Sequence, residues 1–316
     1  MKKIIFLLFL FLLITTATNC NGVNKTVWPT SIPDSDILFQ GKYNGPYIVG
    51  FLDASSSDYQ IIEIPRNFVR LSWSNDGNII YGLNQSDGQP SYENMGYPAF
   101  WDIKANNFVR CYGSLPNYDQ IEEFISDDYL HSVVLSSGEE IVVFDMGSCK
   151  TIKQLVNHQD DLGHGDISGF SFFQAGNELL YGEVFNINTP REYKLIKLNV
   201  ITDEREIEAE GIYPAWSPDG SKFAFIGLDG LYVMCADENQ PIKIYNTSFF
   251  DPWKSGSPYF RVPQPKWSPD GNWIVFHQCI NGYTCTVEDA AIYKIRVSDG
   301  QLIKLYTGGK YPVWHP

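Results

Sequence analysis

The chain has 316 residues, of which 44% are hydrophobic and 19% are charged, so it holds enough apolar material for a sizeable folded core. That balance excludes a disordered or collagen-like chain. Its 23 basic residues against 37 acidic ones give a formal charge of -14, and no basic stripe offsets this charge, so nucleic acid is not an expected partner.

The first 20 residues have the composition of a signal peptide. Lys2 and Lys3 precede an apolar run from Ile4 to Ile14, and small polar residues follow it. The run is shorter than the roughly 20 residues that a helix needs to cross a bilayer. We therefore predict that residues 1–20 are an export signal and that residues 21–36 are a linker.

Cys20 comes directly after this apolar region, a position that resembles the lipobox cysteine of bacterial lipoproteins. Lipidation of Cys20 would anchor the exported chain to a membrane. Asn19 departs from that pattern, which prefers Gly or Ala, and ordinary cleavage after Ala17 is the alternative. The sequence thus predicts either a membrane-anchored lipoprotein or a secreted or periplasmic protein, whose only membrane contact would be the lipid.

Three short strands are predicted next, at residues 37–39, 47–52 and 59–64. A repeated motif then follows. Its clearest copies are residues 71–81, 214–225 and 265–276, in which a Trp-Ser-x-Asp-Gly segment precedes an apolar strand. Each copy has an aromatic residue just before the turn, which we call its anchor. Weaker copies and a last, truncated copy also have one. The anchors are Trp73, Phe124, Phe172, Trp216, Trp267 and Trp314.

The anchors recur about every 48 residues, which is typical of a propeller blade of four antiparallel strands. Proline presets φ and glycine tolerates positive φ, so the Asp of the motif is interpreted as a turn former rather than a catalyst. We predict an all-β fold, a six-bladed β-propeller over residues 37–316. The N-terminal strands would pair with the strand at Trp314 and close the ring, which removes exposed sheet edges.

These Pro-x-Trp-Ser-Pro-Asp-Gly units resemble the PD40, or WD40-like, repeats of the TolB family. The resemblance implies a TolB-like propeller at the cell envelope that works through protein contacts. The separate N-terminal domain of TolB has no counterpart here, because strands begin at about Ile37.

The long predicted connections follow the second and fourth strands of the blades, which places them on one face of the ring. We call this the long-loop face, and we expect it to recognise a protein or peptide partner. Aromatic side chains on it are candidate anchors, although several could instead pack against the blade rim. The candidates are Tyr92, Tyr97, Phe249, Trp253 and Tyr259.

One loop combines imidazole and carboxylate groups, which suit a divalent metal ion. Its candidate ligands are His158, Asp160, His164 and Asp166, and the alternative is an acidic surface loop between two blades. Separately, Cys279 and Cys285 bracket an Asn-Gly turn and could form a disulfide in an oxidising compartment.

No catalytic signature is present: the chain has no Gly-x-Ser-x-Gly elbow, no glycine-rich phosphate loop and no His-Glu-x-x-His pair. We therefore assign no catalytic residue and expect no cofactor. The favoured function is a non-enzymatic binding or scaffold protein. The alternative is an enzyme or glycan-binding propeller of the lyase, hydrolase or lactonase type, which would use the central pocket and a divalent metal ion.

Overall fold

The structure is a computed structural model. It describes residues 37–42, 47–55, 59–62, 68–84, 96–102, 105, 107–111, 120–124, 132–137, 139–158, 165–173, 175, 177–185, 192–246, 264–279 and 286–316. Within these ranges no helix is long and apolar enough to cross a bilayer. The predicted signal peptide, the linker and Cys20 lie outside the described residues.

The described strands form six antiparallel sheets of four strands each. The first sheet joins the two ends of the chain, in the order β24-β1-β2-β3, and the second and third follow along the sequence. Their strands are β1 (Ile37–Lys42), β2 (Tyr47–Leu52), β3 (Tyr59–Ile62), β4 (Phe68–Trp73), β5 (Ile79–Asn84), β6 (Tyr97–Asp102), β7 (Asn107–Arg110), β8 (Gln120–Phe124), β9 (Ser132–Ser136), β10 (Glu140–Asp145) and β11 (Lys150–Asn157).

The other three sheets are each built from four consecutive strands. Their strands, with the closing strand β24, are β12 (Asp166–Phe173), β13 (Glu178–Phe185), β14 (Glu192–Asn199), β15 (Arg205–Ala209), β16 (Ile212–Trp216), β17 (Lys222–Gly227), β18 (Gly230–Cys235), β19 (Ile242–Asn246), β20 (Lys266–Trp267), β21 (Trp273–Cys279), β22 (Ala290–Arg296), β23 (Leu302–Thr307) and β24 (Gly309–Trp314).

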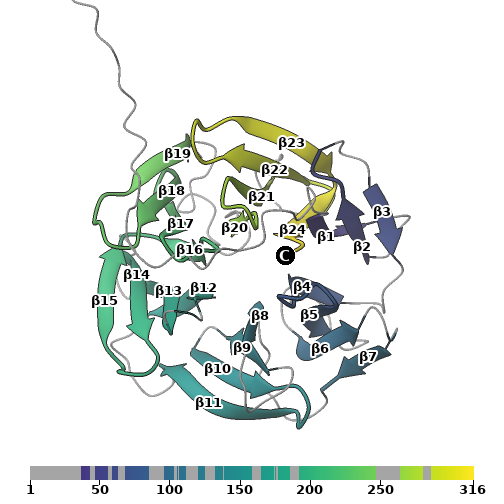
Figure 1. Cartoon of the computed structure of the whole chain (residues 1–316), viewed down its shortest axis with the longest axis horizontal. Coiled ribbons are helices and arrows are strands. Elements are labelled where there is room, and N and C mark those ends of the chain that lie inside the picture. Colours follow the sequence, from purple (N-terminus) through teal and green to yellow (C-terminus); the bar gives the residue numbers. More distant parts are fainter. Residues whose placement is uncertain are drawn as a thin grey trace, which may run out of the picture.

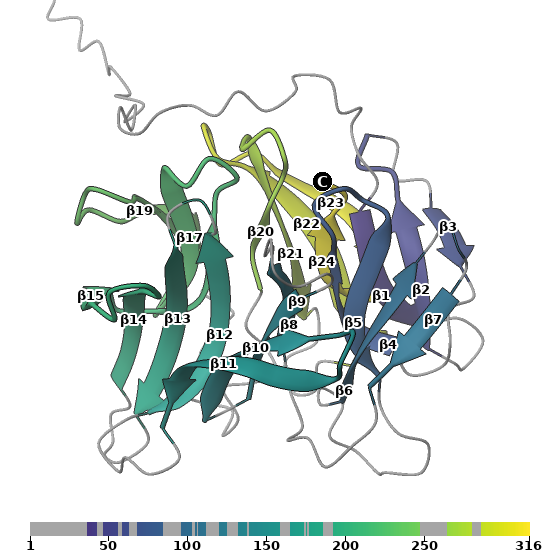
Figure 2. The same cartoon turned by 60° about the horizontal axis from the view of Figure 1, so that its bottom comes forward.

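The sheets stand around a common centre, as Figures 1 and 2 show. The inner strands β4, β8, β12, β16, β20 and β24 surround this centre, and the last strand of each sheet lies at the rim (Figure 1). The chain is therefore an all-β propeller with four-stranded blades. Five of the six predicted anchors end an inner strand, and Phe172 stands one residue before the end of β12.

The predicted ring closure is confirmed. Strand β1 pairs antiparallel with β24, and Ile37 lies opposite Trp314. Beyond the strand, His315 packs against Trp73 of the next sheet, with ring centroids 4.6 Å apart. Both ends of the described chain are thus held in the ring.

The Asp-Gly turns after the inner strands have the role that their composition predicts. Asp219 accepts hydrogen bonds from the Ser217 hydroxyl at 2.8 Å and from the Ser221 N–H at 3.0 Å, and Gly220 has a φ of 67°. Partial burial acts to raise the pKa of Asp219, but these hydrogen bonds and the charge of Lys222 outweigh it and keep the pKa below its ordinary value. The carboxylate is an ionised turn former.

Apolar side chains fill the space between neighbouring sheets. One cluster joins Val69 and Leu83 to Val133 and Phe144 of the next sheet, and comparable clusters join the other neighbours around the ring. Burial of each large apolar side chain contributes about 1.5–3 kcal/mol. Because every sheet shares its core with two others, the ring is one packed unit.

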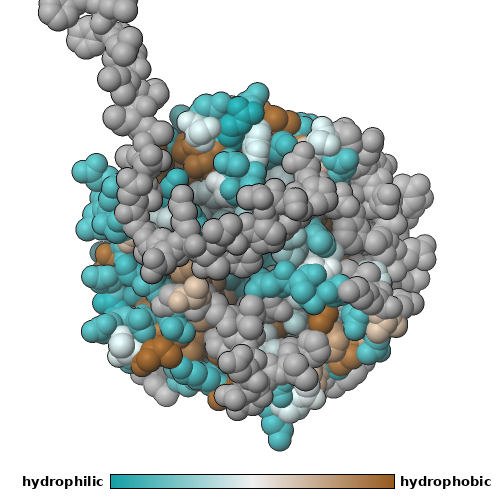
Figure 3. All heavy atoms as spheres, viewed as in Figure 1, coloured by the Kyte–Doolittle hydropathy of each residue, from teal (hydrophilic) through white to brown (hydrophobic). Residues whose placement is uncertain are grey.

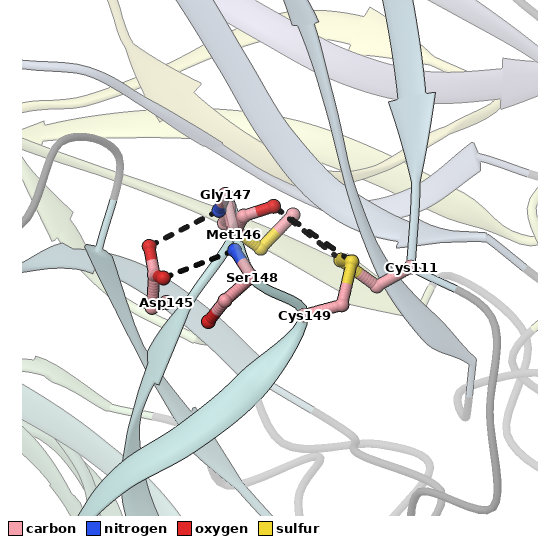
Figure 4. Close-up of a disulfide and its surroundings, with 6 residues drawn as sticks. All are labelled: Cys111, Asp145, Met146, Gly147, Ser148 and Cys149. Carbon is pink, nitrogen blue, oxygen red and sulfur yellow. Dashed lines mark hydrogen bonds between the residues drawn. A yellow bond between two sulfur atoms is a disulfide. The ribbon is translucent and has the colours of Figure 1, made fainter.

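A disulfide that the sequence analysis missed links two neighbouring sheets. Cys111 follows β7 and Cys149 precedes β11, and their Cα atoms are 5.3 Å apart (Figure 4). Their sulfurs lie 3.6 and 3.8 Å from the Met146 carbonyl oxygen. Asp145 accepts hydrogen bonds from the backbone of Gly147 and Ser148, which shapes the turn that carries Cys149.

Candidate functional site

The inner strands share an irregularity at the residue three positions before the aromatic anchor. Arg70, Tyr213 and Tyr311 occupy this position in β4, β16 and β24, and have φ values of 53°, 50° and 50°. Gly169 occupies it in β12 with a φ of 78°. The strand register shifts at each of these sites, which is the signature of a β-bulge.

A bulky residue at positive φ costs on the order of 1–3 kcal/mol and persists only where the surrounding structure enforces it. Glycine would relieve that strain, and Gly169 shows that this chain uses glycine at the position once. The three other bulges instead carry large side chains. We call the six equivalent positions, including Ile121 and Gln264 at the same offset from their anchors, the bulge ring.

Four members of the bulge ring line a small cavity at the centre of the propeller. The centre of a water-sized group can occupy about 20 Å³ within it. That space is enough for a water molecule or for the tip of a polar side chain. The lining residues are Arg70, Leu71, Ile121, Gln264, Lys266, Tyr311, Pro312 and Val313.

Arg70 stacks on Tyr311 at one wall of the cavity. Its guanidinium carbon lies 4.1 Å from the centre of the Tyr311 ring, a cation–π contact between adjacent sheets. The Nε and Nη1 atoms of Arg70 are buried, and among the described residues neither has a hydrogen-bond partner. Arg70 is thus held by its flat face, while two of its donor nitrogens find no acceptor in the described part of the chain.

Behind Tyr311 lies His277, which is 3% exposed. The Tyr311 N–H donates to His277 Nδ1 at 3.4 Å, and the two rings meet edge to face at 4.9 Å. Burial, with the nearby positive charges of Lys310 and Arg70, holds the pKa of His277 well below its ordinary value. A neutral imidazole can accept this bond, so His277 supports the bulge at Tyr311.

An ion pair crosses the centre of the ring. Lys266 of β20 contacts Glu122 of β8, whose sheets stand on opposite sides (Figure 1). Glu122 also accepts a hydrogen bond from the Phe172 backbone N–H at 3.2 Å. The carboxylate of Glu122 is therefore committed to Lys266 and to β12 rather than to Arg70.

The strand order confirms that connections after second and fourth strands leave from one edge of the sheets. Strands β8 and β9 are separated by residues 125–131, which lie outside the described residues, and the expectation that the long connections share one face stays a prediction. The central cavity is lined by the middle of β4 and by Tyr311, Pro312 and Val313 of β24.

Of the five aromatic candidates, the structure describes one. Tyr97 begins β6, pairs with Asn84 and is half-buried, which places it at the long-loop edge of its sheet. Tyr92, Phe249, Trp253 and Tyr259 lie outside the described residues. Their role as partner anchors stays a prediction.

The candidate metal loop is described at its two ends only. His158 Nδ1 lies 3.2 Å from the Gly165 carbonyl oxygen, and Nε2 lies 3.2 Å from Glu183 Oε1, with both side chains buried. Asp166 begins β12, whereas Asp160 and His164 lie outside the described residues. Because both ring nitrogens of His158 face protein oxygens, this imidazole links the end of β11 to Gly165 and to β13, and the metal site stays a prediction.

Among the described residues, one other group could bring three metal-ligating side chains together, namely Cys235, Asp237 and Glu238. Cys235 is disulfide-bonded and both acids are exposed, so the group lacks a thiolate ligand. Cys279 is also disulfide-bonded. Its predicted partner Cys285 lies outside the described residues, and that pairing stays a prediction.

Comparison with known proteins finds structural similarity and no sequence match. No protein-family model matches the sequence, and no curated protein sequence matches it. Among solved structures, TolB from Acinetobacter baumannii superposes with a TM-score of 0.65 at 13% identity, over 89% of this chain and 67% of that one. These similarities show a β-propeller fold.

Two further structures agree. A chain of a nidogen/laminin complex has a TM-score of 0.63 at 10% identity and covers 89% of this chain and 98% of its own. A putative TolB from Agrobacterium tumefaciens has a TM-score of 0.55 at 13% identity, over 88% of this chain and 91% of that one. The TolB-like fold expected from the repeats is thus supported, and family membership is not established by identities this low.

The sequence analysis missed the bulge ring, Arg70 above all. The sequence did contain a sign of these positions. Three residues before several anchors stands Arg, Tyr or Gln, which interrupts the alternation of apolar and polar residues expected in a strand. We assigned these strands to the core alone, because their aromatic anchors recur in register as core residues do. The backbone shift at the bulge turns this position toward the centre, and spacing alone does not reveal such a shift.

Proposed function

We propose that the chain is an exported, six-bladed, TolB-like propeller, one blade for each sheet, which binds a protein or peptide partner at its long-loop face and does not act as an enzyme. The observation that carries this proposal is the bulge ring. The strained residues Arg70 and Tyr311 carry large side chains that line the central cavity, although glycine at these positions would relieve the strain.

The dimensions of the central cavity are compatible with recognition of a side chain. Its space of about 20 Å³ for the centre of a water-sized group is enough to receive the tip of a side chain from a docked partner. The solved neighbours include a propeller in a nidogen/laminin complex, a protein–protein assembly, which is consistent with a binding function.

Export is supported by the cysteines. Cys111, Cys149, Cys235 and Cys279 are all disulfide-bonded, and disulfides persist in oxidising compartments outside the cytosol. We propose residues 1–20 as the export signal, residues 21–36 as the linker and residues 37–316 as the propeller. Cys20 would be the lipid attachment point if the chain is a lipoprotein.

The test is a pull-down from envelope extract with the protein immobilised through its amino terminus. A Trp253→Ala, Tyr259→Ala variant removes two predicted anchors. An Ile201→Ala, Ile207→Ala variant is the matched control, because these side chains are 71% and 66% exposed at the rim. Figure 3, viewed as Figure 1, shows hydrophobic residues in brown scattered among hydrophilic ones in teal where the surface is coloured.

We expect one partner to be recovered by the unaltered chain and by the rim variant, and to be lost from the Trp253, Tyr259 variant. Recovery of the same material by all three chains would contradict binding through the long-loop face. Recovery of no protein would contradict the proposed function as a whole.

A further inference from the structure

The central cavity contains a cationic group, the guanidinium of Arg70, part of whose hydrogen-bonding capacity is not used by the described residues. Arg70 has its Nε and Nη1 atoms buried, and no described residue accepts a hydrogen bond from either. Burying a charged donor without an acceptor is costly, and nearly all buried polar groups in folded proteins are hydrogen-bonded. A strained backbone, with a φ of 53°, holds this group in place.

The surroundings favour an anionic acceptor. Lys266 also lines the cavity, and the one carboxylate described beside it, that of Glu122, is bound by Lys266 and by the Phe172 N–H. Buried Lys310 lies near Tyr311, its Nζ atom 5.9 Å from the ring centre. The local field is thus positive, although the whole chain carries a formal charge of -14.

The size and shape of the cavity select among anions. The Tyr311 ring covers one face of the guanidinium, so an acceptor must approach in its plane, which suits a flat group with two oxygens. A volume of about 20 Å³ suits the tip of a carboxylate. A polyanion would be repelled by the overall charge of the protein.

We propose that Arg70 is the receptor for a single carboxylate that enters the central cavity from the long-loop face. The carboxylate belongs either to an acidic side chain or to the carboxy terminus of a bound peptide. This inference rests on the proposed function and names the chemical group of the partner that enters the central cavity. His277 acts as a positioning residue, since it supports the bulge at Tyr311 without lining the cavity, whereas Tyr311 lines the cavity and holds the flat face of Arg70.

The test uses three capped probes with the purified protein. Acetyl-Gly-Glu-Gly-amide offers an acidic side chain, acetyl-Gly-Gly offers a terminal carboxylate, and acetyl-Gly-Gln-Gly-amide is the neutral twin of the first. Binding is followed by ligand-observed NMR and by the shift of the arginine Nε–H resonances. Arg70→Gln removes the charge, and Lys304→Gln, on an exposed position of β23, removes one charge away from the cavity.

We expect at least one carboxylate probe to bind the unaltered protein roughly tenfold or more tightly than the neutral probe. Arg70→Gln should lose this preference, Lys304→Gln should keep it, and the preferred probe identifies the source of the carboxylate. Equal binding of the three probes, or a preference that survives Arg70→Gln, would overturn the proposal.

If Arg70→Gln does not fold, the arginine resonances of the unaltered protein test whether the carboxylate binds at this site. Movement of one Nε–H signal with the Glu probe and not with the Gln probe supports the site, and no movement overturns it. The outcome is separable from that of the pull-down. A partner captured equally by the unaltered chain and by Arg70→Gln would leave the binding function standing and remove the carboxylate site.

Discussion

At the scale of single residues, the turns after the inner strands are small hydrogen-bonded units with a shared geometry. Gly77, Gly220 and Gly271 have φ values of 67°, 67° and 68°, a region that glycine enters without strain. What differs is their surroundings. A Cβ atom on Gly220 would lie 2.2 Å from the ring of Phe173 in the neighbouring sheet, whereas one on Gly271 would meet nothing within 4 Å.

This difference gives a matched pair of variants. Gly271→Ala should lower the free energy of unfolding by about 1 kcal/mol, because alanine there is strained by its positive φ and meets no steric clash. Gly220→Ala should cost about 1–3 kcal/mol more, because Phe173 must move from its place against Trp216. Urea unfolding of both variants checks this, and equal losses would show that the turn does not pack against the neighbouring sheet.

A second prediction at this scale concerns pH. The folded pKa of His277 is depressed by burial and by Lys310 and Arg70, while in the unfolded chain it is about 6.5. Below that pH the unfolded chain takes up a proton that the folded chain excludes. Stability contributed by the neutral ring is therefore complete above about pH 7 and falls as the pH drops, by at most about 1.4 kcal/mol per pH unit.

The measurement compares urea midpoints of the unaltered chain and of His277→Asn between pH 7.5 and 5.5. The amide oxygen of asparagine can accept the Tyr311 N–H bond without titrating. We expect the unaltered chain to lose stability faster over this interval. Parallel profiles for the two chains would mean that His277 is not kept neutral by the fold.

At the scale of elements, the parts that the sequence predicted are those determined by local chemistry. The Trp-Ser-x-Asp-Gly turns fix φ and hydrogen bonds within a few residues, so the inner strands end where predicted, as at Trp73 and Trp216. The pairing of β1 with β24 was also predictable, because an incomplete last repeat requires its missing strands from elsewhere in the chain.

The elements that were missed depend on contacts between sheets. Arg70 reaches the central cavity through a bulge, and its neighbour Tyr311 is distant in sequence. Cys111 and Cys149 meet because one strand end adjoins a turn of the next sheet, which cysteine spacing does not show. The Glu183 carboxylate faces His158 for the same reason. Pattern reasoning places residues on strands, and packing then decides which of them meet.

The Cys111–Cys149 disulfide provides a prediction for elements. Its two cysteines are 38 residues apart, so in the chain-entropy account the bond stabilises the fold by about 4 kcal/mol. A Cys111→Ser, Cys149→Ser variant should lose about 2–4 kcal/mol of unfolding free energy and should keep its preference for carboxylate probes. A mild reductant that breaks this bond should destabilise the unaltered chain in the same way. No difference between the two chains under oxidising conditions would show that packing alone joins these sheets.

At the scale of the whole molecule, stability depends on closing the ring. Each inter-sheet core needs both of its sheets, and the core between the first and second sheets is built from Leu38 and Val313 on one side and Phe68 and Ile80 on the other. Without β24, the first sheet would keep three strands and expose the edge of β1. An open ring has unpaired edges at which a second copy can add.

Two truncations separate closure from simple shortening. A chain that ends at Trp314 keeps β24 and loses only the packing of His315 on Trp73, which should cost about 1 kcal/mol. A chain that ends at Gly308 loses the whole strand and with it the buried Val313 side chain and the pairing with β1. We expect a loss of at least about 3 kcal/mol, together with self-association. Sedimentation and urea unfolding measure both effects, and a monomeric Gly308-ended chain as stable as the Trp314-ended one would mean that the ring holds without its closing strand.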